Sequence, residues 1–216
     1  MPIAVLGGTF NPIHLGHLYI AKTVLTHFNC SECILIPNGQ PPHEKAPISA
    51  KHRLKMLELA IEPHENFKID PRETLREGPS FTVLTLQELR QQYLNESLIF
   101  ILGDDAFASL ESWFMWETLL DYAHLVIIRR FEPPLTKTLQ SYLNQHLCHQ
   151  NQTINNHPSG FIYRLNQPLN PNQSSIIRQT LQSHPRRFLT NSLNFDPNQL
   201  PQSVWEYILD HQLYAS

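Results

Sequence analysis

The sequence predicts an α/β protein with a parallel sheet, and two patterns point to this class. Short apolar runs of strand length, at residues 3–6, 33–36, 98–102 and 125–128, alternate with segments whose apolar residues recur at helical spacing. Such alternation is typical of parallel strands, which need a long crossover, usually a helix, between them. The 216 residues suit one domain with a sizeable core, so we expect a single domain over residues 1–216.

Composition and charge exclude several classes of function. The formal net charge is −3 and the basic residues form no tract, so we expect no extended surface for nucleic acid or anionic membrane. The amino terminus lacks the basic and apolar regions of a signal peptide, and no apolar run approaches the length of a membrane span. These features predict a cytoplasmic protein.

The three cysteines, an odd number, argue against a disulfide framework. Cys30 and Cys33 form a CxxC pattern, but they follow the first predicted helix and precede a strand. A redox pair normally gains its low thiol pKa from a helix N-terminus, and a structural zinc would need four ligands. We therefore expect ordinary reduced thiols.

A glycine- and histidine-rich turn joins the first strand to the first helix. Gly7 and Gly8 let the backbone turn tightly and approach a ligand closely, and Pro12 fixes φ just before the helix. In a parallel sheet this turn lies at the carboxyl edge, where the helix start offers unpaired N–H groups and partial positive charge to an anion. His14 and His17, three residues apart, can both donate hydrogen bonds to phosphate oxygens. The turn therefore predicts a phosphate site.

Two other interpretations of this turn are possible. The two histidines could lie on the surface beside an ordinary tight turn, or they could bind a metal together with His43 or Asp105. Histidines at a glycine-rich helix entry fit phosphate better than a caged metal, so we expect no resident metal site. The turn is neither GxGxxG nor GxxxxGK[ST], so the usual dinucleotide and P-loop fingerprints are absent.

The string GGTFNPIHLGHL resembles the T/HxGH signature of the nucleotidyltransferase superfamily and, in this longer form, the bacterial nicotinate-nucleotide adenylyltransferase family. The resemblance implies a Rossmann-like, doubly wound parallel sheet with helices on both faces. It implies transfer of the adenylyl group of ATP to nicotinate mononucleotide, with Mg²⁺ carried mainly by the ATP phosphates. It makes His14 and His17 catalytic and assigns ATP binding to residues of the same turn: Gly7, Gly8, Thr9 and Phe10.

The resemblance extends to two segments that would form the mononucleotide pocket. The loop at residues 37–45 is similar to the family's PPHK-type loop, which makes Asn38 and Lys45 binding candidates. The string PSFTVLTL, at residues 79–86, resembles the segment whose threonine amide helps hold the nicotinate carboxylate, here that of Thr82. From the residues alone, Lys45 would be a solvated lysine and Thr82 a first-turn helix residue.

Two further segments follow the central strand predicted at residues 98–102. Gly103 and Asp105 match the family's GxD pattern and are implied to bind ATP, whereas an acidic pair there could equally cap the next helix or bind a cation. Residues 113–116, WFMW, lie in a segment predicted as an amphipathic helix. The resemblance implies that Trp113 stacks on the pyridine ring and that the amide of Phe114 binds its carboxylate; Trp116 is expected in the core.

The strand predicted at residues 125–128 ends in a segment that resembles the family's strand before an RPG turn. Arg130 is thereby implied on the nucleotide side, although Phe131 replaces the proline. The following residues 132–158 are rich in Gln, Asn and His and carry no motif, and a polar helix is predicted over residues 135–147. We expect this segment to be an excursion from the core.

A last strand is predicted at residues 161–165, and the sequence NQSSIIR follows it closely. Serines before a helical run can cap it, and an arginine one turn in can bind phosphate. The sequence resembles the superfamily's ISSTxIR motif with an altered start, and implies ATP binding by Ser174 and Ser175 and catalysis by Arg178. The closing segment, 204–214, resembles the family's final helix, which we expect to be a packing element.

Rival functions come from other classes. A related adenylyl- or cytidylyltransferase with another phosphate acceptor, such as phosphopantetheine, would share the first motif. A non-catalytic nucleotide-binding module would have the same fold without the activity. Both proposed catalytic motifs retain their charged residues, which argues against this alternative. The long first motif, the PSFT segment and the Trp113–Phe114 pair favour ATP and nicotinate mononucleotide as partners, in a monomer or a homo-oligomer.

Overall fold

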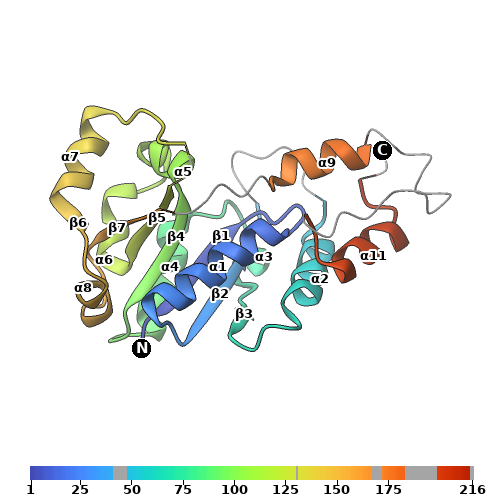
Figure 1. Cartoon of the computed structure of the whole chain (residues 1–216), viewed down its shortest axis with the longest axis horizontal. Coiled ribbons are helices and arrows are strands. Elements are labelled where there is room, and N and C mark those ends of the chain that lie inside the picture. Colours follow the sequence, from blue (N-terminus) through green and yellow to red (C-terminus); the bar gives the residue numbers. More distant parts are fainter. Residues whose placement is uncertain (41–47, 130, 167–171, 183–198, 215–216) are drawn as a thin grey trace.

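The structure, a computed structural model, describes residues 1–40, 48–129, 131–166, 172–182 and 199–214. A seven-stranded sheet with parallel pairing throughout organises these residues (Figure 1). In chain order the strands are β1 (Ile3–Gly8), β2 (Glu32–Pro37), β3 (Phe67–Ile69), β4 (Leu98–Gly103), β5 (His124–Arg129), β6 (Leu147–Cys148) and β7 (Ile162–Asn166). Their order across the sheet is β3-β2-β1-β4-β5-β7-β6.

The helices cover both faces of the sheet. One core cluster contains residues of α1 (Leu15–Phe28), α2 (Ala50–Ile61), α8 (Asn151–Asn156), α9 (Ser174–Gln182) and α11 (Gln202–Asp210). The other contains residues of α4 (Thr82–Gln92), α5 (Asp104–Ala108), α6 (Leu119–Tyr122) and α7 (Lys137–His146). The short α3 (Arg72–Leu75) lies between β3 and α4 in the chain. The structure is thus the doubly wound parallel sheet that the resemblance predicts.

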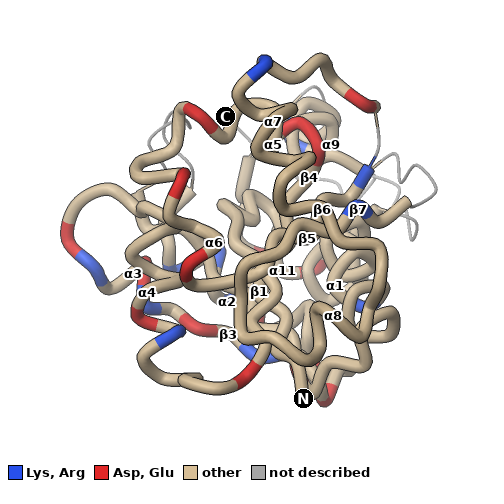
Figure 2. Tube along the Cα trace, turned by 90° about the vertical axis from the view of Figure 1, so that its left-hand side faces the viewer, with Lys and Arg blue, Asp and Glu red and all other residues tan. Residues whose placement is uncertain are grey.

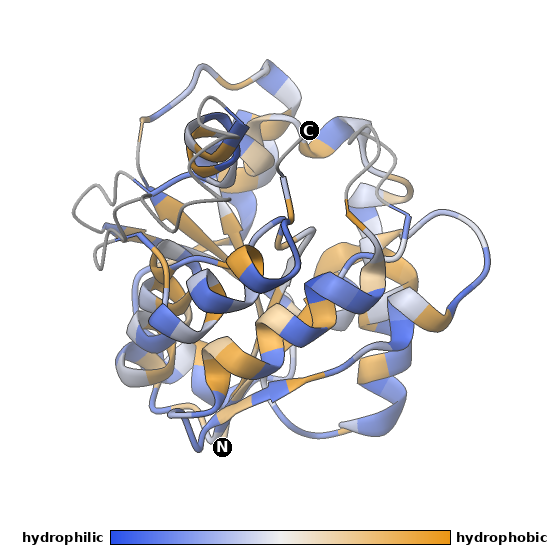
Figure 3. Ribbon diagram, turned by 90° about the vertical axis from the view of Figure 1, so that its right-hand side faces the viewer, coloured by the Kyte–Doolittle hydropathy of each residue, from blue (hydrophilic) through white to orange (hydrophobic). Residues whose placement is uncertain are grey.

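Alternation along the strands explains why two separate clusters form. Successive strand side chains point to opposite faces, so Ala4 and Ile101 enter the cluster with α1, whereas Val5 and Phe100 enter the cluster with α4. Both faces are therefore apolar, which is why the strands appear in the sequence as continuous apolar runs. The helices show the complementary pattern, with hydrophobic residues on one side and hydrophilic residues on the other (Figure 3).

The chain reverses its winding at β1. β1 pairs with β2 on one side and with β4 on the other, and the helices that follow β1 and β4, α1 and α5, pack on opposite faces of the sheet. Such a topological switch point leaves a crevice at the carboxyl ends of the two central strands. Gly7, Gly8 and Gly103 all lie at these ends.

The segment at residues 132–158 differs from the expected excursion. Leu139 and Leu143 of α7 are buried in one core cluster and Ile154 of α8 in the other. Between these helices, β6 pairs in parallel with β7 and extends the sheet. Partly buried apolar residues of the same segment, among them Leu135 and Tyr142, pack against these clusters, so composition alone understates how fully the segment joins the core.

The cysteine positions agree with ordinary thiols. Cys33 lies on β2 and is buried, and burial raises the pKa of its thiol. Burial also raises the pKa of Cys30 to about 12. Both groups are therefore protonated at neutral pH, which is the opposite of an activated redox pair.

The surface charge is mixed, and the helices of the described residues are too short or too polar to span a membrane. Lys and Arg residues are interspersed with Asp and Glu residues along the described trace (Figure 2). Among the helices of the described ranges, none combines the length and the apolar character needed to cross a membrane.

A buried histidine at the opposite, amino-terminal edge of the sheet makes stability depend on pH. The Nδ1 atom of His124 accepts a hydrogen bond from the backbone N–H of Phe161 at 3.2 Å, and its Nε2 atom donates to the carbonyl of His157 at 2.9 Å. The bond to Nδ1 requires the neutral ring, because a protonated nitrogen cannot accept a hydrogen bond. Burial lowers the pKa of His124 from 6.5 to about 4.

We expect acid to destabilise the fold through this residue. The unfolded chain binds a proton at pH values where folded His124 does not, so the stabilisation is complete above about pH 6.5 and is lost as pH falls toward 4. The contribution is roughly 2–3 kcal/mol. Urea unfolding of wild type and His124→Asn between pH 4 and 7 measures it: the variant should show a shallower pH dependence, and the exposed-site control His149→Asn should not. Equal slopes for wild type and His124→Asn would contradict this assignment.

Candidate active site

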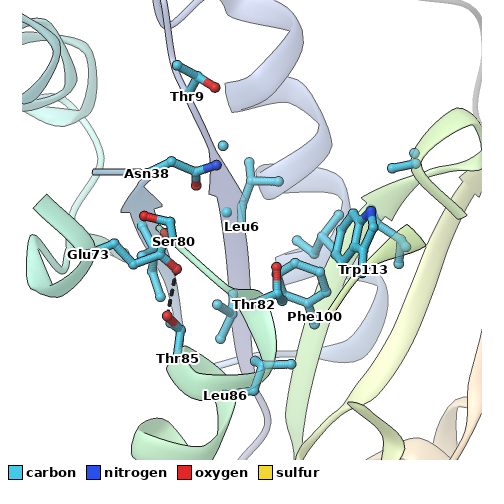
Figure 4. A pocket seen from close by; sticks show the side chains of 18 of the residues that line it. Leu6, Thr9, Asn38, Glu73, Ser80, Thr82, Thr85, Leu86, Phe100 and Trp113 are labelled. Carbon is cyan, nitrogen blue, oxygen red and sulfur yellow. Dashed lines mark hydrogen bonds between the residues drawn. The ribbon is translucent and has the colours of Figure 1, made fainter. Parts of the chain in front are cut away.

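A cavity of about 590 Å³ lies at the carboxyl ends of β1, β2 and β4. This volume is in the range of small-molecule sites. Its walls come from the turn after β1, the segments that precede α4 and the residues that follow β4 (Figure 4). Ten of the residues predicted to function line it: Gly7, Gly8, Thr9, His17, Asn38, Thr82, Gly103, Asp105, Trp113 and Phe114.

At the end of β1, two glycines line the cavity with backbone that carries no side chain. A Cβ atom added at Gly7 would meet only the ring of Phe100, at 3.4 Å, and one added at Gly8 only the ring of Phe10, at 3.4 Å. Both are ordinary contact distances, so the fold itself tolerates a methyl group at either position. The glycines are therefore best explained by the close approach of a ligand to the backbone.

The two histidines of the turn stack on each other. His14 is the N-cap of α1 and is buried, and its ring centroid lies 3.7 Å from that of His17. The Nδ1 atom of His17 accepts the backbone N–H of His14 at 3.3 Å. In the neutral ring this arrangement puts the proton on Nε2, so His17, which lines the cavity, has Nε2 as its N–H donor.

Two features of this turn limit what it offers to a ligand. The side chain of Phe10 enters the core and packs edge-to-face on His17 at 5.1 Å, so it does not line the cavity. The first-turn N–H groups of α1 are also not all available to an anion, because that of Leu15 donates to the carbonyl of Gln199 at 3.0 Å. A segment far along the chain thus occupies one of the donors.

The helix α9 is docked against the first turn rather than on the cavity wall. Ser174 donates its hydroxyl to the carbonyl of Pro12 at 3.0 Å, and Nη1 of Arg178 donates to the carbonyl of Asn11 at 2.7 Å. Ser175 is exposed on the same helix. The structure therefore brings Arg178 next to the histidine turn, as predicted, but gives Ser174 a bond that holds the turn.

A polar wall, formed by Asn38, Glu73, Ser80 and Thr85, lines the side of the cavity below β2 (Figure 4). The hydroxyl of Thr85 donates to Oε1 of Glu73 at 2.6 Å, and the backbone N–H of Gly39 donates to Ser80 Oγ at 2.9 Å. Burial raises the pKa of the Glu73 carboxyl. Sequence reasoning missed Glu73, Ser80 and Thr85; their only signal is that polar residues follow β3, whose end lies at the same edge of the sheet.

Aromatic residues form the wall on the other side. Trp113 packs edge-to-face on Phe100 with ring centroids 6.3 Å apart, and Phe114 packs on Phe81 at 4.8 Å. The predicted amphipathic helix here is wrong. Two short 3₁₀ turns, Leu110–Ser112 and Trp116–Thr118, flank an extended Trp113, and this break lets both Trp113 and Phe114 line the cavity. Trp116 is half-buried against Tyr142, in keeping with a packing role.

The two acidic residues after β4, Asp104 and Asp105, lie in different environments. Asp105 is exposed and lines the cavity, as predicted for a ligand-site residue. Asp104 is buried and accepts the backbone N–H groups of Phe131 and Glu132 at 2.7 and 3.0 Å. Phe131 stands where the resembling family has proline, which has no N–H to donate. Asp104 therefore ties down the turn after β5.

Two predicted residues, Lys45 and Arg130, lie outside the described residues. Across the described part of the chain, no group of three or more His, Cys, Asp or Glu side chains gathers as a metal site would require. The cavity thus combines an imidazole donor and open backbone at one end with an aromatic wall and a polar wall at the other. This combination suits a phosphorylated ligand that carries a flat ring.

Comparison with known proteins gives one family throughout. Residues 5–180 match the family model described as cytidylyltransferase-like. A protein of Hahella chejuensis is 40% identical over 221 residues, covering 100% of this chain and 96% of that protein. One of Klebsiella pneumoniae is 37% identical over 217 residues, covering 98% and 96%. Both are named probable nicotinate-nucleotide adenylyltransferase.

Solved structures agree on the fold. A Plasmodium falciparum nicotinic acid mononucleotide adenylyltransferase, in complex with NaAD, matches with a TM-score of 0.73 at 18% identity and covers 99% of this chain and 97% of its own. The same enzyme in complex with APC matches with a TM-score of 0.71. At this identity the likeness concerns the architecture alone.

The polar wall depends on a glycine whose replacement should damage the fold. A Cβ atom at Gly39 would lie 2.0 Å from the backbone carbonyl oxygen of Glu73, so one of the two segments must move. We expect Gly39→Ala to lower the free energy of unfolding by about 1–3 kcal/mol. Gly7→Ala is the matched control and should change it by less than about 0.5 kcal/mol. Urea unfolding of both variants is the test, and equal stability of the two would contradict the close approach at Gly39.

Proposed function

Because this chain belongs to the cytidylyltransferase-like family and, within it, to the nicotinate-nucleotide adenylyltransferases, we propose that it transfers the adenylyl group of ATP to nicotinate mononucleotide. The products are deamido-NAD and pyrophosphate, a step of NAD biosynthesis. One observation carries the proposal: a single cavity holds both the glycine-histidine turn and the Trp113 wall. The reaction is assigned to the cytoplasm, because ATP is an intracellular metabolite.

The reaction needs no activated protein nucleophile. The phosphate of the mononucleotide has a second pKa near ~6 and is already mostly dianionic at neutral pH. One of its oxygens attacks the α-phosphorus of ATP in line, a new P–O bond forms, and the bond to the bridging oxygen of pyrophosphate breaks. Such a transfer is accelerated mainly by positioning and by stabilisation of charge on the transferring group.

The proposed charge stabilisers come from the turn after β1 and from α9. His17 offers its Nε2–H to the cavity, His14 holds that ring by stacking, and Arg178 stands next to the same turn. Gly7, Gly8, Thr9 and Gly103 provide backbone for ATP, while Asp105 is the acidic group at its side. Arg130, Ser174, Ser175 and the backbone of Phe10 are further ATP-side candidates from the family resemblance.

The acceptor half of the cavity suits a nicotinate ring. Trp113 provides a flat face for stacking. Thr82 is the first residue of α4, so its N–H belongs to the helical turn whose donors have no partner within the helix, and it favours an anionic substituent. The amide of Phe114 lies on the same cavity. Asn38 and Lys45 are the proposed partners for the rest of the mononucleotide.

Nucleotidyltransferases use a divalent cation, and we propose that Mg²⁺ enters with ATP as part of the substrate. The described residues contain no cluster of three potential metal ligands, which fits a cation held largely by phosphate oxygens and water. Asp105 is the cavity carboxylate suited to contact it. When bound, the cation neutralises charge on the phosphates.

Pyrophosphate release with ATP and Mg²⁺ tests the function. We expect fast release with nicotinate mononucleotide and slower release with nicotinamide mononucleotide, because backbone N–H donors favour a carboxylate over an amide. Phosphopantetheine should support none. Release with phosphopantetheine alone would replace the proposed acceptor, and no release with any acceptor, together with intact ATP binding, would favour a nucleotide-binding module.

The imidazole of His17 should matter for rate rather than for folding. We expect His17→Ala to lower kcat by roughly 10²–10³-fold, as for other preorganised donors to a transition state. Its melting temperature should stay close to that of wild type, because the ring is only half-buried. His14 is a poorer probe, because it is buried at the N-cap of α1 and its loss would also cost stability.

The matched control is His149→Ala, an exposed histidine between β6 and α8, which should retain full kcat. Steady-state kinetics with nicotinate mononucleotide, accompanied by thermal unfolding, makes the comparison. An unimpaired kcat in His17→Ala would overturn the role given to this residue.

A further inference from the structure

Arg53 of α2 has a guanidinium enclosed by backbone from other segments. The residue is only 1% exposed. Its Nη1 atom donates to the carbonyl of Thr9 at 2.8 Å, its Nε atom to that of Ile48 at 3.2 Å and its Nη2 atom to that of Gly39 at 3.4 Å. Arg53 does not line the cavity, and these three hydrogen bonds tie its side chain to backbone carbonyls of three segments.

These carbonyls belong to segments that form both halves of the cavity. Thr9 ends the glycine turn on the ATP side, and Gly39 follows Asn38 on the mononucleotide side. The backbone N–H of Gly39 in turn donates to Ser80 Oγ at 2.9 Å, just before α4 begins. A continuous line of hydrogen bonds therefore runs from the first turn through Arg53 to the start of α4.

We propose that Arg53 is a positioning residue that fixes the two substrate-binding loops relative to each other and thereby sets the distance over which the phosphate attacks. The inference rests on the proposed function, because that function assigns ATP to one half of the cavity and nicotinate mononucleotide to the other. The planar guanidinium can donate to three carbonyls at once, whereas a lysine ammonium on the same stem is a single point donor. A displacement of about 1 Å between reacting groups can cost on the order of 10²-fold in rate.

The chain contains a matched control at the other edge of the sheet. Arg90 of α4 likewise donates to several backbone carbonyls: to those of Tyr93, Glu96 and Tyr122 at 2.7–3.0 Å, to that of Leu94 at 3.4 Å and to that of Pro158 at 2.5 Å. These segments precede β4, β5 and β7, at the amino-terminal edge of the sheet. Arg90 thus clamps backbone as Arg53 does, but away from the cavity.

The experiment compares Arg53→Lys with Arg90→Lys at a temperature well below both unfolding transitions. Both variants should lose stability. Arg53→Lys should lower kcat/KM about 10–100-fold for ATP and for nicotinate mononucleotide alike, because both loops are released. Arg90→Lys should retain kcat/KM within about threefold of wild type, because the segments it releases do not line the cavity.

Amide hydrogen exchange gives a second readout that does not depend on activity. Arg53→Lys should speed exchange at residues 8–10, 38–40 and 80–82, and Arg90→Lys only at residues 93–97 and near 122 and 158. The inference is overturned if Arg53→Lys keeps wild-type kcat/KM, if Arg90→Lys loses as much, or if exchange at the cavity loops is unchanged. An inactive wild type with faster loop exchange in Arg53→Lys would instead refute the proposed function and leave the loop-holding role intact.

Discussion

The parallel pairing of β1 with both β2 and β4 is the constraint on which the site depends. In this register Gly7 lies beside Ile36, and Leu6 lies beside Ile101, so the carboxyl ends of three strands finish at nearly the same level. Because the connections leave β1 and β4 toward opposite faces, the helices that follow these two strands lie on either side of the ends and leave a crevice between them. The cavity is the space that results, and small residues at the end of β1 keep it open. The apolar strands that form the core thus also fix the position of the cavity.

Where strands end, their loops expose backbone groups that no longer have a sheet partner, and buried or half-buried polar side chains form hydrogen bonds with these groups. Arg53 and Asp104 do so at the carboxyl edge, one as donor and one as acceptor, and Arg90 and His124 do so at the amino edge. Burying such groups is costly unless they are hydrogen-bonded, and each of these forms at least two bonds. The hydrogen bonds offset the desolvation cost of these polar side chains and also order the loops, which at the carboxyl edge carry the proposed site.

The sequence allowed the sheet and most of the cavity to be predicted, but not the contacts that hold the cavity in shape. Apolar runs identified each long strand, and the glycine turn identified the edge where a ligand would bind. Helical spacing around Trp113 suggested a helix, because aromatic periodicity does not reveal the 3₁₀ breaks that turn its ring toward the cavity. The role of Arg53 could not be predicted from the sequence, because the three partners described above are backbone carbonyls, and every residue type offers the same carbonyl. Glu73 went unnoticed for a related reason: its burial depends on tertiary packing of α3 against the sheet.

The last segments of the chain complete the first motif. The carbonyl of Gln199 takes the N–H of Leu15, the hydroxyl of Tyr214 donates to Asn11 Oδ1 at 2.8 Å, and Ser174 holds Pro12. A glycine turn at a helix start often binds phosphate through backbone N–H groups, yet here one of these donors is committed to the protein's own closing segment. At the same helix start, His17 lines the cavity and has its Nε2–H as the donor of its neutral ring. The packing of the C-terminal segments therefore occupies one backbone donor of this helix start, whereas the side chain of His17 keeps its own donor on the cavity side.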